Sequence, residues 1–171
     1  MKKTLILILL STALTACGGG EKDQDIPKQE EAQEIERKVA VIEPTELIQA
    51  FRASGLPVGD VVIHTAESDP NNLLGRPDGY TASAHFEDTS VEQDQPFEEG
   101  ETVLPKGGVI EVWGTQEKAE ARKTYIEEVN NTFNMPGLKQ YMYIHKDVLL
   151  RLEYDIIPDQ AKKYEDVLNS L

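Results

Sequence analysis

From about residue 41 to the C-terminus, hydrophobic residues recur at the spacings that are typical of helices and strands. The clearest strand pattern is YTASAHFE, in which Tyr80 and every second residue after it are apolar or small, so His85 is expected to face solvent. The pattern predicts these elements, in chain order: a helix over 44–54, strands over 58–65, 80–87 and 107–114, a helix over 115–133, strands over 139–145 and 148–155, and a helix from 158 to the C-terminus.

The order of these elements is α-β-β-β-α-β-β-α, and it indicates the fold class. The last two strands are joined only through His145-Lys146-Asp147, a link too short for anything but a hairpin. Such connections favour a mainly antiparallel sheet, and each amphipathic helix needs a partner for its apolar side. We therefore predict an α+β fold, a two-layer sandwich with the helices on one face of a mainly antiparallel sheet.

The chain begins with the order of segments that is typical of a secretory signal peptide. Lys2 and Lys3 precede the apolar run LILILL, and residues 11–16 are mostly small. The apolar run is much shorter than the roughly 20 residues that a membrane-spanning helix needs. We therefore predict that residues 1–16 are a removed signal peptide.

The sequence LTAC, residues 14–17, resembles the lipobox of bacterial lipoproteins. The resemblance implies that the Cys17 thiol receives a diacylglycerol, that the chain is cut before Cys17, and that membrane lipid is a partner through this acylated cysteine. Two or three acyl chains give stable attachment, whereas a single chain is marginal. Because Cys17 is the one cysteine in the chain, an internal disulfide is impossible. The implied location is the extracytoplasmic side of the cell membrane.

Residues 17–40 continue from this cysteine as three glycines and a mixed-charge run with few large apolar residues. Such a composition cannot bury enough surface to offset the entropy lost on ordering. A flexible coil of this length has an r.m.s. reach of about 25–30 Å. We predict a lipidated tether over residues 17–40 and one globular domain over residues 41–171.

The formal net charge of −14, with 17 Lys and Arg against 31 Asp and Glu, limits the possible partners. Removal of residues 1–16 takes away two lysines and makes the chain more acidic still. Nucleic-acid binding needs a basic surface, and so does attraction to an anionic membrane. We therefore predict no nucleic-acid partner, and we expect the lipid, not the surface of the domain, to hold the protein at the membrane.

The segment DPNNLLGRPDGYTASAHFED, residues 69–88, resembles a motif of the form DPNxLLGRPxxYTSKxxFxD. That motif belongs to a family of small bacterial lipoproteins and secreted proteins, and the similarity extends over most of residues 45–168. The chain has Ala82 and Ala84 where the family shows a Ser-Lys-like pattern. Because the family has no characterised activity, the resemblance implies fold and location and no catalytic residue.

Within this motif, LLGRPDGY contains the candidate ligand-binding residues Arg76 and Tyr80. The Arg76 guanidinium offers five donors in a planar fork that suits a carboxylate or a phosphate, and the surrounding glycines and proline predict a rigid loop. The alternative is structural: Arg76 pairs with Asp69 or Asp78 and holds the loop together.

Catalytic and metal-binding patterns are missing from the sequence. There is no GxSxG, His64, His85 and His145 lack zinc spacing, and the acidic loop at 87–105 does not match an EF-hand. We predict no catalytic residue, metal or cofactor, and a non-enzymatic binding or interaction module whose partner is an envelope protein or a small ligand. One alternative is an envelope hydrolase that uses two carboxylates about 5–10 Å apart, and another is a purely structural role in envelope organisation.

Overall fold

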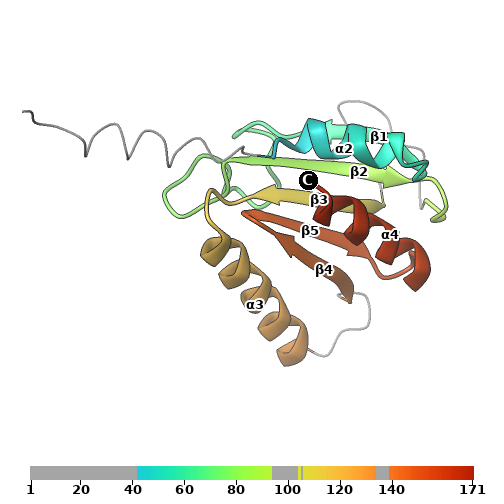
Figure 1. Cartoon of the computed structure of the whole chain (residues 1–171). Helices are drawn as coiled ribbons and strands as arrows, with labels where there is room; N and C mark the ends of the chain where they lie inside the picture. Colours follow the sequence, from blue (N-terminus) through green and yellow to red (C-terminus); the bar gives the residue numbers. More distant parts are fainter. Residues whose placement is uncertain (1–41, 94–103, 105, 134–138) are drawn as a thin grey trace, which may run out of the picture. The chain divides into compact units, whose positions relative to one another are not determined.

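The computed structural model describes residues 42–93, 104, 106–133 and 139–171 (Figure 1). The predicted signal peptide, Cys17, the tether and most of the acidic loop lie outside these residues and stay predictions. The elements are α2 (Pro44–Ala53), β1 (Val58–Ile63), β2 (Ala82–Asp88), β3 (Gly107–Val112), α3 (Gln116–Phe133), β4 (Gln140–His145), β5 (Val148–Glu153) and α4 (Pro158–Asn169).

The five strands form one sheet in the spatial order β1-β2-β3-β5-β4, and every neighbouring pair is antiparallel. The β4–β5 hairpin turns at Lys146, whose φ of 52° is in the left-handed region. The α+β class, the antiparallel sheet and the order of the elements are as predicted.

Helices α2 and α4 cover one face of the sheet, which we call the first face (Figure 1). Phe51 of α2 and Tyr164 of α4 meet edge to face with ring centroids 4.8 Å apart, and the Phe86 ring of β2 lies 5.6 Å from that of Tyr164. All three side chains are fully buried. The larger hydrophobic core therefore lies between these two helices and the first face.

A buried carboxylate fixes α4 to the end of β2. Asp88 is fully buried, and its Oδ2 accepts a hydrogen bond from the Tyr164 hydroxyl at 2.9 Å and another from the Gln160 side chain at 2.7 Å. The carboxylate therefore replaces its lost hydration with hydrogen bonds from α4, as a buried charge requires.

Helix α3 lies on the opposite, second face, whereas the prediction placed all helices on one face. Successive residues of a strand point to opposite sides of a sheet. Accordingly, Val148 and Leu150 of β5 belong to the core under α2 and α4, while Leu149 packs with Ala119 and Ile126 of α3. Because β5 is apolar at consecutive positions, both of its faces need a cover, and α3 supplies the second one.

Candidate functional site

Helix α3 packs mainly on β4 and β5 of the second face, and a pocket of about 200 Å³ lies on that face near the starts of β3 and β4. The side chains around the pocket come from four strands and the segment before β3. The described lining residues are His85, Leu104, Lys106, Gly107, Gly108, Val109, Lys139, Gln140, Arg151, Leu152 and Glu153. We call this hollow the second-face pocket.

Two glycines at the start of β3 allow the backbone to pass close to β2 beside this pocket. A Cβ on Gly107 would lie 2.3 Å from the backbone nitrogen of Asp88, and a Cβ on Gly108 would lie 2.3 Å from Cζ of Phe86. Both distances are too short for any side chain. The sequence GG therefore brings β3 against β2 and leaves no side chain of its own in the pocket.

A buried ion network holds Arg151 in the pocket wall. Glu111 of β3 is fully buried, its Oε1 lies 2.8 Å from Nη1 of Arg151, and its Oε2 lies 3.5 Å from Nε of Arg122. The Trp113 indole donates a further hydrogen bond to Glu111 at 3.2 Å. Arg151 Nε also donates to the side-chain oxygen of Gln140 at 2.7 Å. These bonds use two of the five N–H donors of Arg151, so the side chain is fixed and still has donors for a ligand.

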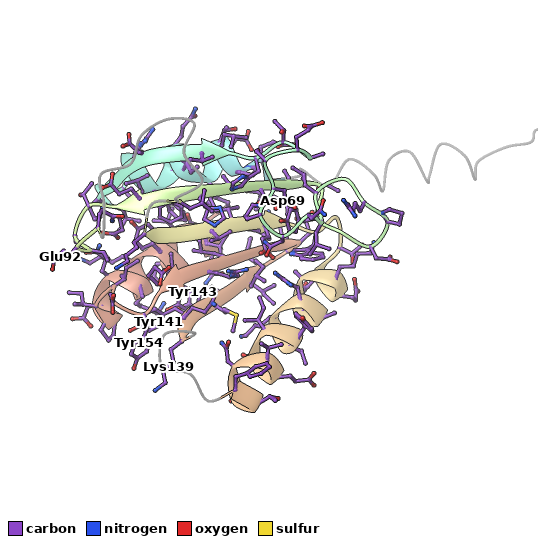
Figure 2. The ribbon with its side chains drawn as sticks, turned by 180° about the vertical axis from the view of Figure 1, so that it is seen from behind. Asp69, Glu92, Lys139, Tyr141, Tyr143 and Tyr154 are labelled. Carbon is purple, nitrogen blue, oxygen red and sulfur yellow. The ribbon has the colours of Figure 1, made fainter. Side chains whose placement is uncertain are left out.

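The described lining of the pocket contains three cations and one carboxylate, Glu153. Lys106 and Arg151 line its wall, and Lys139 lies at the start of β4 with its Nζ 5.7 Å from the centroid of the Tyr154 ring (Figure 2). This excess of positive charge occurs in a chain whose net charge is −14. Arginine and lysine together suit a phosphate or a carboxylate group, so the pocket fits an anion.

His85, which the strand pattern placed toward solvent, instead makes a histidine pair with His64. Nδ1 of His85 lies 2.6 Å from Nε2 of His64, and the two rings meet edge to face. Burial lowers the pKa of His85 to about 3, with further contributions from the nearby His64 and Arg151. Burial also lowers the pKa of His64. Both rings are therefore neutral at neutral pH, and the positive charge of the pocket comes from lysine and arginine alone.

Tyr80, a predicted ligand-binding residue, is fully buried in the structure. Its ring packs edge to face on Trp113 at 5.3 Å, and its hydroxyl donates to Asp69. Asp69 also accepts the backbone N–H groups of Leu73 at 2.6 Å and Leu74 at 2.9 Å. Asp69 is partly desolvated, yet these hydrogen bonds hold its pKa below the ordinary value. The structure thus gives Tyr80 a packing role in this loop, not a surface for a ligand.

Arg76, the other predicted ligand-binding residue, is exposed and donates to the side-chain oxygen of Asn72 in the same loop. Neither of the two carboxylates that the sequence suggested pairs with it: Asp69 accepts from Tyr80, and Asp78 forms an ion pair with Lys118 at 3.4 Å. The loop joins the sheet where Thr81 donates to the Val112 carbonyl, at the far end of β3 from the second-face pocket. Arg76 and the pocket are therefore separate features.

The fold and the site together define an α+β domain with an antiparallel sheet and a polar, cation-lined pocket beside a buried ion network. No family profile, curated protein or solved structure matches this chain. Among the residues that the structure describes, no helix is both long and apolar enough to span a bilayer, and no cluster of three or more His, Cys, Asp or Glu is arranged for a metal ion.

Proposed function

We propose that this protein is a membrane-anchored extracytoplasmic lipoprotein that acts as a non-enzymatic binding module and takes a small anionic ligand in the second-face pocket. The anchor rests on the lipobox-like LTAC and the signal-peptide pattern before it. The flexible composition of residues 17–40 supports a tether between the lipid and the domain.

The observation that carries the binding proposal is the lining of the pocket. Arg151 is held by Glu111 and Gln140, and Lys106 and Lys139 line the same hollow. A donor that is already held in place loses little conformational freedom when a ligand binds, which favours affinity. A hollow of about 200 Å³ has room for a phosphate- or carboxylate-bearing group of a small molecule.

The hydrolase alternative has less support from the same residues. Acid–base hydrolysis of a glycosidic bond needs two carboxylates in one cleft, about 5–10 Å apart. The described lining contains one, Glu153, while Glu111 is fully buried and engaged by two arginines. We therefore favour binding over hydrolysis for this pocket.

A calorimetric titration of the full chain with inorganic phosphate and with succinate tests the anion proposal. The informative variants are Lys139→Gln and Lys106→Gln, and the matched control is Lys163→Gln, which removes the same charge from an exposed position on α4. Each pocket variant is expected to weaken binding about fivefold, roughly 1 kcal/mol, with no change in the control. Equal weakening in Lys163→Gln, or no measurable binding of either anion, would refute the proposal.

The anchor is tested independently of the pocket. Cys17→Ser removes the thiol that the lipobox resemblance assigns to the lipid, so fatty-acid labelling and membrane retention are expected to disappear in cells. Equal labelling of the parent chain and the variant would contradict the anchor and leave the pocket proposal unaffected.

A further inference from the structure

Strand β4 is an edge strand of the sheet, and its outer side lies in a groove that is separate from the second-face pocket. In the described part of the chain β4 pairs with β5 alone, through six consecutive residue pairs from Gln140–Glu153 to His145–Val148. In an antiparallel pair, every second residue points its N–H and C=O away from its partner strand. The outer side of β4 therefore offers a row of backbone donors and acceptors.

The groove along this edge has a volume of about 740 Å³. Its floor is formed by Met142, Tyr143 and Ile144 of β4, with α3 on one side and Glu165 of α4 on the other (Figure 2 labels Tyr143). The residues that α3 contributes are Gln116, Glu120, Lys123, Thr124 and Glu127. The two helices thus border the edge strand and leave room for an extended chain between them.

The other edge strand of the sheet, β1, is less suited to pair with a further strand. The ladder of β1 changes register between Val58 and Val61, an irregularity that natural proteins use to keep edges from pairing. β4 has a regular ladder, and its central residues Met142, Tyr143 and Ile144 include no proline or lysine. Of the two edges, β4 is therefore the one suited to accept another strand.

We propose that the β4 edge binds an extended segment of a partner protein that carries lysine or arginine at alternate positions, which adds to the sheet as a sixth strand. The charges of the groove determine the choice of partner. Glu120 and Glu127 on α3 and Glu165 on α4 outnumber Lys123, the one cation in the described lining. Alternate side chains of an added strand point to opposite sides of the sheet, so its basic residues meet the carboxylates of a flanking helix.

The same charges disfavour a second copy of this chain at the edge. A β4–β4 pairing would bring the two acidic grooves together in chains that each carry a formal net charge of −14. Like charges at close range are destabilising, and opposite charges steer association. A basic segment of a different protein is therefore the favoured occupant.

The test uses the full chain and three synthetic peptides: one that alternates Lys and Val, one that alternates Glu and Val, and a Lys-Val peptide in which two central valines are replaced by proline. The Lys-Val peptide is expected to bind and to slow amide exchange at Met142 and Ile144 or at their β4 neighbours. The proline peptide keeps the charge but lacks the ladder donors, so it is expected to bind at least about tenfold more weakly.

Charge variants of α3 complete the experiment. Glu120→Gln and Glu127→Gln are expected to weaken binding of the Lys-Val peptide by about threefold each, while Glu117→Gln, exposed on the same helix outside the groove, has no effect. Equal binding of the Lys-Val and proline peptides, equal binding of the Glu-Val peptide, or concentration-dependent pairing of the chain with itself through β4 would overturn the proposal. Lys106→Gln, in the pocket and next to β3, leaves this binding unchanged, which separates it from the pocket.

Discussion

The half-buried His64–His85 pair predicts that the domain loses stability as the pH falls from neutral toward 5. In the folded chain, burial and the adjacent charged and polar groups lower the pKa of His85 from its ordinary 6.5 to about 3. A proton on the nitrogen at the contact would also set two N–H donors against each other across 2.6 Å. The unfolded chain has no such restriction, so it binds protons at a pH at which the folded chain does not.

The sign and size of the effect follow from this difference. Between about pH 6.5 and pH 3 the unfolded state holds one more proton at this position than the folded state, so stability falls as the pH falls through this window. Each pH unit in the window costs about 1.4 kcal/mol, which gives a loss of about 2 kcal/mol between pH 6.5 and pH 5. The lowered pKa of His64 acts in the same direction. The pKa of Asp69 is lowered from its ordinary value of 3.8, so that carboxylate affects stability only at a more acidic pH than the interval from pH 6.5 to pH 5.

Urea denaturation of the parent chain and of two variants measures this slope between about pH 7 and pH 5. His85→Gln removes the titrating ring and is expected to flatten the dependence, while Asn131→Gln, at an exposed position on α3 with no titrating group, is the control and keeps the parent slope. A parent chain equally stable at both pH values, or a His85→Gln chain that keeps the full slope, would refute the reasoning.

Three substitutions at other positions have expected outcomes that the same denaturation assay measures. Glu111→Gln leaves two arginines without their buried carboxylate and is expected to cost about 3–5 kcal/mol; a cost below about 1 kcal/mol would contradict the network. Tyr164→Phe removes a hydrogen bond to the buried Asp88 and is expected to cost about 1–3 kcal/mol, whereas an unchanged midpoint would mean that water replaces the hydroxyl. Gly108→Ala places a Cβ against the Phe86 ring and is expected to cost about 1–3 kcal/mol; a stabilised variant would show that β3 can move away from β2.

The sequence pattern was sufficient to predict the helices and strands, because features of neighbouring residues determine where they form. Pro44 and Pro158 lie at the first turns of α2 and α4, where a residue without an N–H is best tolerated. The alternation in residues 80–87 indicated β2, and the short link at 145–147 indicated the β4–β5 hairpin. These are features of neighbouring residues, so no knowledge of distant contacts was needed.

The prediction placed α3 on the wrong face of the sheet because it did not use the apolar pattern of β5. Val148, Leu149 and Leu150 are apolar at consecutive positions of β5, and a strand of that kind is covered on both faces. Apart from Ala119 and Ile126, α3 buries few residues, so its own pattern indicated its covered side only weakly.

Sequence patterns could not predict the pocket, because its residues are brought together by the register of the sheet. Glu111 and Arg151 each interrupt an otherwise apolar strand, and a charge at such a position indicates a buried partner. The identity of that partner depends on the pairing of β3 with β5, in which Val109 is opposite Arg151 across 42 positions of sequence. The loop around Arg76, in contrast, has a local sequence signal, because its glycines and proline lie together in the chain.

The electrostatic balance of the second face is the strongest reason to regard it as a binding surface. The chain has 31 acidic and 17 basic residues, so it contains enough carboxylates to pair with every cation. On this face Glu111 lies between Arg122 and Arg151, so this buried network carries more positive than negative charge. Lys139 and Lys106 also line this hollow, with Glu153 as the carboxylate in its described lining. A bound anion would reduce this imbalance and would stabilise the folded chain in proportion to RT ln(1 + [L]/Kd). Because charges beyond about 8 Å are largely screened at physiological salt, the acidic remainder of the surface would not prevent an anion from entering the pocket.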